Sequence, residues 1–161
     1  EQVAEGRAAY DAGRCDAYTT DVSGLAATRA SQVPVPADHV ILPEVISKEP
    51  LGPAVRHGDQ RWADVVRWSF FAMLEGEELG LTSANIEAAL TSQNPSIQRF
   101  VGVNGDLGRM LGLDNRWAFN VIRHVGNYAE SFTRNVTPLG IERGPNRLWR
   151  DGGLMYSPPL R

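Results

Sequence analysis

Gly13-Arg14-Cys15-Asp16-Ala17-Tyr18-Thr19-Thr20-Asp21 is the stretch that decides the fold class of this chain. A helical pattern covers residues 2–10 before it, and Ser23-Gly24-Leu25-Ala26-Ala27 begins another helix after it. We interpret this stretch between two helices as a short buried strand that ends on a carboxylate, in an α/β protein. The strand ends on Asp21, and open α/β sheets bind ligands outside the carboxyl ends of their strands. Asp21 is therefore the first candidate for a binding residue.

A stiff, extended region follows this unit. Val33-Pro34-Val35-Pro36 is constrained because proline fixes φ, and His39-Val40-Ile41-Leu42 alternates like a short strand. Residues 43–50 begin and end with proline, which predicts a constrained crossover. We expect a hinge between two parts of the chain here.

Two strong helical patterns occupy the rest of the sequence. The first has Asp59 as its N-cap and Gly76 and Gly80 near its end, and a shorter helix is predicted from Thr82 or Ser83 to Leu90. The core-facing positions of the first helix are Trp62, Val65, Val66, Ser69, Phe70 and Met73. The second pattern begins after Asp114, and its apolar stripe is Ala118, Val121, Ile122, Val125, Tyr128 or Ala129, and Phe132. Beyond Thr133 no period persists, which predicts an ordered surface tail.

Composition excludes some classes of function. The chain has 161 residues, a formal net charge of -3 and 42% hydrophobic residues, which suits one domain with a core. Nucleic acid binding needs clustered Lys and Arg, whereas the 16 basic residues are scattered here. No stretch is long and apolar enough to span a bilayer, and the chain opens on Glu1 with no export signal to read.

The cysteine and histidines predict no metal site. Cys15 is the only cysteine, so it can form no disulfide within the chain, and we expect it to be a small buried residue of the strand. His39, His57 and His124 lack the spacing of a zinc motif, and we expect them to be surface residues or satisfied by hydrogen bonds.

Two further stretches complete a resemblance to a known family. They are Ile46-Ser47-Lys48-Glu49-Pro50-Leu51-Gly52-Pro53-Ala54-Val55-Arg56-His57-Gly58-Asp59 and the tail Gly152-Gly153-Leu154-Met155-Tyr156-Ser157-Pro158-Pro159-Leu160-Arg161. Together with residues 13–21, they resemble the C-terminal half of periplasmic solute-binding proteins of polar amino acid ABC transporters, most of all the general L-amino-acid branch. The resemblance covers nearly the whole chain.

The resemblance implies the fold. It is the C-terminal part of a bilobed, type II periplasmic-binding-protein-like α/β fold, incomplete in this chain. Residues 1–44 would form the end of the second lobe, with a helix, a strand, a helix and an edge strand. Residues 45–161 would form the hinge return and the C-terminal part of the first lobe with its tail. We expect the full-length protein to be a monomer and this chain alone to dimerise or aggregate, since strands that should cover its helices would be missing.

The resemblance also implies a function. The protein would bind L-amino acids in the periplasm and deliver them to an ABC transporter permease, without a cofactor, a metal or a catalytic residue. Asp21 would contact the ligand's α-ammonium group, with Thr20 and Thr19 as secondary ligand-binding residues. The carboxyl-binding arginine of the family is not expected in this half, so Arg56 is not given that role.

Other interpretations stay open. Asp21 also suits the N-cap of the following helix, and a cap and a ligand contact can coexist. A periplasmic enzyme on the same fold, such as a dehydratase or lyase, would need a general acid or base that the sequence does not nominate beyond Asp21. A chain without independent activity is the third possibility.

Overall fold

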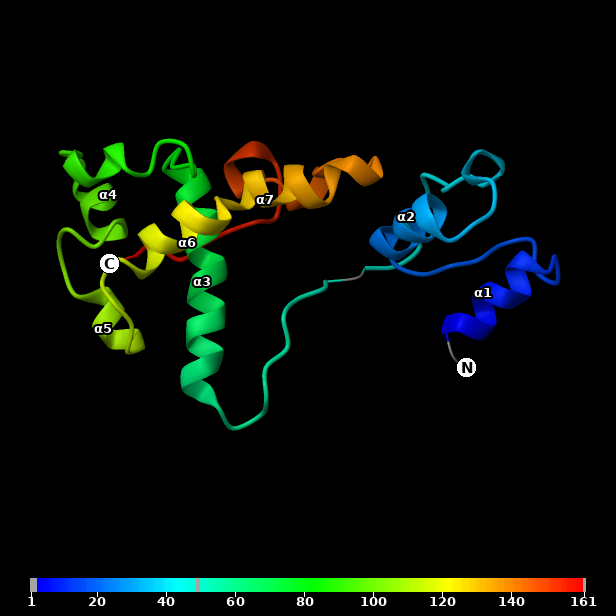
Figure 1. The fold of residues 1–161 in the computed structure, drawn as a ribbon, viewed down its shortest axis with the longest axis horizontal. Coiled ribbons are helices and arrows are strands. Elements are labelled where there is room, and N and C mark those ends of the chain that lie inside the picture. Colours follow the sequence, from blue (N-terminus) through cyan, green and yellow to red (C-terminus); the bar gives the residue numbers. More distant parts are fainter. Residues whose placement is uncertain (1–2, 49, 161) are drawn as a thin grey trace. The chain divides into compact units, whose positions relative to one another are not determined.

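The computed structural model describes residues 3–48 and 50–160 (Figure 1). The chain divides into two compact units. Unit 1 comprises Glu1–Leu51 with Pro138–Ile141, and unit 2 comprises Gly52–Thr137 with Glu142–Arg161. The predicted division after residue 44, and the assignment of its two parts to lobes, stay predictions.

Unit 1 contains the two predicted helices and almost no core. Helix α1 is Val3–Asp11, helix α2 is Val22–Ser31, and a 3₁₀ turn, η1, covers Pro36–Asp38. Gln2, where the first helix was expected to begin, lies outside the described residues. Of the described hydrophobic residues in this unit, Ala26 alone is buried. Polar contacts connect its segments instead: Tyr10 Oη lies 2.6 Å from His39 Nδ1, and Arg7 donates to Gln32 Oε1.

The predicted strands do not form in the part of the chain that the structure describes. Residues 13–21 lack strand structure, and Cys15 is exposed rather than buried. The expected edge strand at residues 39–42 is extended but belongs to no ladder. The β pairing in the described residues is one isolated parallel bridge, Leu148 with Met155. The strand predictions were therefore wrong for this chain, because a strand requires a hydrogen-bonded neighbour that these segments do not find.

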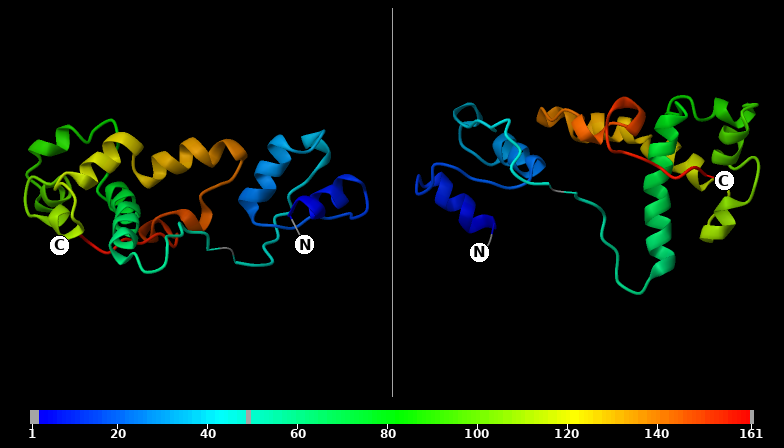
Figure 2. Two further views of the ribbon diagram at one scale, coloured as in Figure 1. Left: turned by 60° about the horizontal axis from the view of Figure 1, so that its bottom comes forward. Right: turned by 180° about the vertical axis from the view of Figure 1, so that it is seen from behind.

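Unit 2 is built around helix α3, Gln60–Glu78. Its N-cap is Asp59, as predicted, and the Asp59 carboxylate accepts a hydrogen bond of 3.0 Å from the backbone N–H of Trp62. Helices α6 and α7 follow one another against α3 (Figure 2). The remaining elements of the unit are η2 (Ala88–Thr91), α4 (Pro95–Phe100), α5 (Leu107–Leu111), α6 (Trp117–Val125), α7 (Tyr128–Asn135), η4 (Gly144–Asn146) and η5 (Trp149–Asp151), and η3 (Thr137–Leu139) lies at the boundary of the units.

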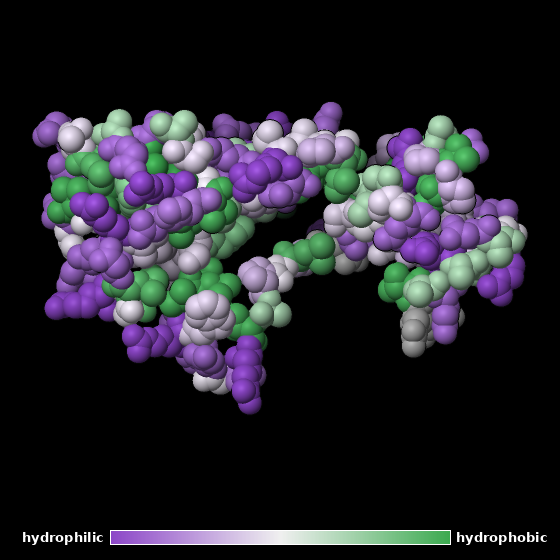
Figure 3. Space-filling model, in the orientation of Figure 1, coloured by the Kyte–Doolittle hydropathy of each residue, from purple (hydrophilic) through white to green (hydrophobic). Residues whose placement is uncertain are grey.

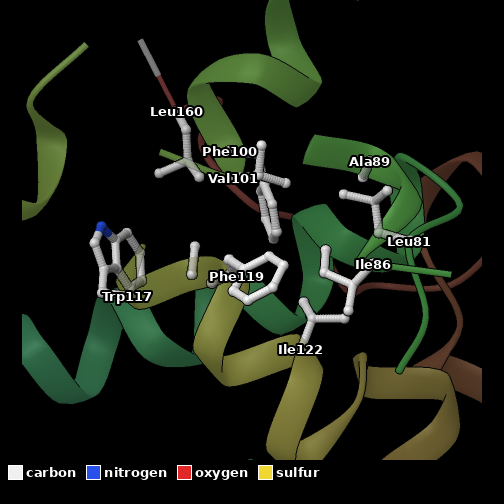
Figure 4. Close-up of a cluster of buried hydrophobic side chains, with 11 residues drawn as sticks. Leu81, Ile86, Ala89, Phe100, Val101, Trp117, Phe119, Ile122 and Leu160 are labelled. Carbon is white, nitrogen blue, oxygen red and sulfur yellow. The ribbon is translucent and has the colours of Figure 1, made fainter. Parts of the chain in front are cut away.

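The core of unit 2 lies between α3, α4, α6 and the residues around η2 (Figure 4). Its buried residues are Ala72, Leu81, Ile86, Ala89, Phe100, Val101, Trp117, Ala118, Phe119, Ile122 and Leu160. Trp62 was expected in the core but is 54% exposed, because α3 turns Trp68 and Ala72 toward the core instead. Phe119 is almost fully buried and was absent from the predicted stripe.

The second predicted helix is two helices with a break between them. Gly126 has φ 89°, a conformation that glycine adopts without strain. Asn127 then caps α7 in a capping box with Glu130. The buried Asn127 side chain also donates 2.8 Å to the carbonyl of Leu81. The apolar stripe continues across the break, so periodicity alone did not reveal it.

The tail from Glu142 onward packs on unit 2 and is partly buried, whereas the sequence predicted a surface tail. Arg143 forms a bidentate ion pair with Glu77 at 2.6 and 3.1 Å. Trp149 Nε1 donates to the Glu78 carboxylate at the same end of α3. Leu148 is buried, and Leu160 enters the core. No described helix has the length and apolar character needed to cross a membrane.

Gly102 allows a close backbone approach that can be tested. Its φ is 74°, and a Cβ at this position would lie 2.1 Å from the backbone oxygen of Asn115. Gly80 is a matched control, because it has φ 68° and open space around it. Gly80→Ala should cost about 1–2 kcal/mol through backbone strain alone. Gly102→Ala should cost a further ~1–3 kcal/mol through overpacking.

Urea unfolding followed by tryptophan fluorescence measures this difference, since all four tryptophans of the chain lie in unit 2. Equal midpoints for the two variants would contradict the contact with Asn115.

Glu130 makes the stability of unit 2 depend on pH. Burial raises the pKa of Glu130, but hydrogen bonds from the Ser83 side chain and from the Asn127 and Ser83 backbones bring it below its usual value. A pKa that is lower in the folded state contributes stability above the ordinary value of about 4.3, and this contribution disappears as pH falls through the folded pKa. Glu130→Gln should therefore reduce the loss of stability between about pH 5 and 3.

The same fluorescence assay, repeated at several pH values, tests this expectation. Glu87→Gln is the control, because Glu87 pairs with Arg123 at the exposed surface, where such pairs contribute little. An unchanged acid limb in Glu130→Gln would contradict the prediction.

Candidate ligand-binding site

Asp21 is the N-cap of α2, as the sequence allowed. Its backbone angles are φ -60° and ψ 151°, outside the helical range, and its side chain turns back over the first turn. Oδ2 accepts 2.7 Å from the backbone N–H of Gly24 and also accepts from the hydroxyl of Ser23. Oδ1 accepts a long hydrogen bond of 3.3 Å from Thr20 Oγ1. These contacts involve neighbours in sequence only, so the cap fixes the carboxylate locally.

The Asp21 carboxylate retains capacity for another donor. An ionised carboxyl group has about four lone-pair sites, two on each oxygen. In the described chain, Oδ2 uses two of them, whereas Oδ1 uses one for the weak contact with Thr20. Oδ1 can therefore accept from a ligand without losing the cap.

Local hydrogen bonds keep this carboxylate charged. The Ser23 side chain and the Gly24 backbone N–H lower the pKa of Asp21, and they outweigh the smaller opposing effect of burial. Both donors favour the ionised form, as does the position at a helix N-terminus. Asp21 is thus a preplaced anion at neutral pH.

Gly24 makes room for this arrangement. A Cβ on Gly24 would lie 3.1 Å from Asp21 Oδ1 and 3.1 Å from Thr20 Cγ2. These distances are shorter than ordinary van der Waals contact, so a side chain at position 24 would push against the carboxylate. The Ser23-Gly24 pair after Asp21 is the sequence signal for this site.

Thr19 and Thr20 are both exposed. The expected alternation, with one threonine facing the interior, was wrong, because the segment is not a strand in this structure. Thr20 lies against Asp21 through its hydroxyl. The Thr19 side chain makes no hydrogen bond to any described residue.

Two surface hollows are lined by residues other than Asp21. One, of about 360 Å³, is in unit 1 and is lined by Tyr10, Asp11, Pro34, Val35, Asp38 and His39. The other, of about 390 Å³, is in unit 2 and is lined by Thr82, Asn127, Ala129, Glu130, Thr133 and Arg134. The sequence analysis singled out neither, since each combines residues from separate segments. Among the described residues, no three His, Cys, Asp or Glu side chains are grouped to hold a metal ion.

Comparison with known proteins finds related sequences of about twice this length. The chain is 55% identical, over 98% of its residues, to the glutamate/glutamine/aspartate/asparagine-binding protein BztA of Rhodobacter capsulatus. It is 54% identical over its whole length to the general L-amino acid-binding periplasmic protein AapJ of Rhizobium johnstonii. The chain spans 48% of each of these relatives. No family model matches it.

A solved structure agrees with these sequences. It is an ABC transporter periplasmic binding protein from Brucella ovis with glutathione bound. The whole chain superposes on 51% of that protein with a TM-score of 0.93 and 53% identity. This similarity confirms the predicted fold class. The covered share of the solved protein, 51% of its chain, fits a match to the C-terminal half. The likeness holds even though the expected strands are unpaired here.

The cap role of Asp21 can be separated from its charge. Asp21→Ala removes the cap and should destabilise α2 by about 0.5–2 kcal/mol, whereas Asp21→Asn keeps an oxygen that can accept from Gly24. Hydrogen exchange of the α2 amides should therefore be roughly 2- to 30-fold faster in Asp21→Ala and nearly unchanged in Asp21→Asn. Equal exchange in wild type and Asp21→Ala would show that the cap does not stabilise this helix.

Proposed function

The chain is homologous to about half of the amino-acid-binding periplasmic proteins of ABC transporters, and from this premise we propose that it supplies one side of an amino acid site in the periplasm. Asp21 is the proposed contact for the ligand's α-ammonium group. Thr20, and then Thr19, are proposed to assist it with their hydroxyls. The remaining contacts would come from the half of the relatives that this chain does not span.

One observation carries this proposal. Asp21 is an ionised carboxylate whose Oδ1 still has a free lone pair in the described chain and whose position is fixed by a helix cap. An ammonium group is a cation with three donors, and a charge-assisted hydrogen bond to a carboxylate is about twice as strong as a neutral one. Because the cap holds the carboxylate already, the ligand need not order it.

The lowered pKa of Asp21 favours binding over catalysis. A general acid or base works best when its pKa lies near the operating pH. Local hydrogen bonds move the pKa of Asp21 in the opposite direction, further below neutrality. Asp21 is therefore better suited to hold a cation than to transfer protons, which places a dehydratase- or lyase-like activity second.

A transporter is the proposed partner. The relatives are named for amino acid ABC transporters or for amino acid binding, and this supports delivery to a membrane permease. In such a system, two lobes close around the ligand, and the closed form differs from the open one in the surface that it offers.

Glutathione widens the proposed class of ligand. The Brucella ovis protein holds this γ-glutamyl tripeptide, and it is 53% identical to the present chain. Glutathione keeps a free α-ammonium and α-carboxyl group on its glutamyl residue. We therefore propose ligands that carry a free α-amino acid group, with side chains from glutamine or glutamate to a γ-glutamyl peptide.

Binding can be measured in a chimaera in which this chain replaces the matching half of the Rhizobium johnstonii protein. Titration calorimetry with L-glutamine, L-glutamate and glutathione should show binding by the unmodified chimaera. Asp21→Ala and Asp21→Asn should both weaken it by about 2–4 kcal/mol, since each removes the charge opposite a buried ammonium group. N-acetyl-L-glutamine, which has no ammonium group, should bind poorly to all three proteins.

Asp21→Asn is the decisive variant, because it preserves the helix cap. If Asp21→Asn binds glutamine as tightly as the unmodified chimaera does, Asp21 is only a cap. Binding of glutathione without binding of glutamine would restrict the ligand to peptides.

A further inference from the structure

The loop between α4 and α5 contains the dipeptide Asn104-Gly105, and no other asparagine of the sequence is followed by glycine. This loop runs along the outside of unit 2 (Figure 1), where hydrophilic and hydrophobic residues are mixed on the surface (Figure 3). Asn104 and Gly105 are both exposed, and a Cβ on Gly105 would meet no atom within 4 Å. Solvent therefore reaches both residues.

Two groups of this dipeptide lack hydrogen bonds. Among the described residues, the Asn104 side chain has no hydrogen-bond partner, and the Gly105 backbone N–H has no acceptor. The loop is held by other groups. The backbone N–H of Asn104 donates 3.2 Å to the Gln98 carbonyl, and the Gly105 carbonyl accepts 3.1 Å from Asn115 Nδ2. The Asn104 amide can therefore turn toward the Gly105 nitrogen without first breaking a hydrogen bond.

This arrangement suits a reaction within the chain. Asparagine is one of the thermolabile residues of proteins. The backbone nitrogen of the next residue can close a five-membered ring with the side-chain amide carbon of asparagine. A side chain on the next residue hinders this approach, whereas glycine has no Cβ and moves freely. Asn104 thus combines the most reactive neighbour with an open loop.

We propose that Asn104 is a site of spontaneous deamidation, with water as the co-reactant. A base in the solvent removes the Gly105 N–H proton, and the nitrogen attacks Asn104 Cγ. The new N–Cγ bond closes a succinimide ring, while the Cγ–Nδ2 bond breaks and Nδ2 leaves as ammonia after taking a proton from water. A water molecule then opens the ring at either carbonyl, which leaves aspartate or isoaspartate at position 104.

Either product loosens the loop from Asn115. Each places a negative charge at position 104, two positions before the Asp106 carboxylate, and like charges repel. In isoaspartate the main chain is also longer by one methylene group, which shifts Gly105 relative to Asn115. The hydrogen bond between these two residues joins the loop to the residues before α6, and Val101 at the start of the loop is fully buried. Deamidation therefore lowers the stability of unit 2, independently of the ligand site.

Asp151-Gly152 offers a matched control. Asp151 is exposed like Asn104, and Gly152 has φ 80°, close to the 83° of Gly105. The Gly152 N–H, however, donates 3.2 Å to the carbonyl of Trp149. Asp151→Asn therefore creates a second Asn-Gly dipeptide in which the attacking nitrogen is engaged in a hydrogen bond.

Peptide mapping by mass spectrometry tests the proposal in the Asp151→Asn chain, aged in mildly alkaline buffer with and without guanidinium chloride. Asn104 should deamidate in the native chain within about 3-fold of its rate in denaturant, since no hydrogen bond has to break first. The asparagine introduced at position 151 should react about 3- to 10-fold more slowly in the native chain than in denaturant. An Asn104 that is slowed by folding as much as position 151, or that stays intact, would overturn the proposal.

Asn104→Gln tests the effect on stability. Its side chain is one methylene longer and would have to close a less favourable six-membered ring. Aged wild-type chain should unfold at a lower urea concentration than fresh chain, whereas aged and fresh Asn104→Gln should unfold at the same concentration. A fully converted wild-type sample with the midpoint of the fresh chain would overturn the loosening of the loop from Asn115.

Discussion

Helix α6 packs closely against α3 at Gly76, where the absence of a side chain leaves room for Ile122. A Cβ at Gly76 would come within 2.6 Å of Ile122 Cδ1, so the buried Ile122 side chain would have to shift. Phe100 fills the space beside this contact and links α4 to it. The rest of unit 2 depends on this crossing: α7 continues from α6 through the cap at Asn127, and the tail attaches to Glu77 at the end of α3.

Unit 1 has a different source of order. Ala26 is its single buried hydrophobic residue among those described, so apolar burial can contribute little to its stability. Its conformation relies on side-chain hydrogen bonds, such as that between Tyr10 and His39, and on the cap at Asp21. Each such hydrogen bond makes a net contribution of only about 0.5–1.5 kcal/mol to the stability of the fold. A unit of this kind gains most from a partner that covers its exposed apolar side chains.

The sequence predicted what is decided locally. Asp59 and Asp21 were identified as caps because a cap involves residues three positions apart, and both helices begin where expected. Strands were predicted wrongly because a strand depends on a hydrogen-bonded neighbour from elsewhere in the sequence, which the described segments do not find. Periodicity placed Trp62 in the core, yet the face of a helix that becomes buried is chosen by its tertiary neighbours. The break at Gly126 was missed because the apolar stripe continues through it.

Ligand binding likewise depends on one local structure and one non-local structure. The orientation of the Asp21 carboxylate is set by Ser23 and Gly24, within one helical turn, and needs no sheet behind it. The cleft that would surround a ligand is a non-local structure, and its formation depends on pairing that this chain does not complete by itself. The free-energy cost of ordering the binding site therefore comes from assembling the cleft, because the charged group is already in position. A carboxylate fixed by a local cap can select ligands by their ammonium group, while the residues brought in by assembly select among side chains.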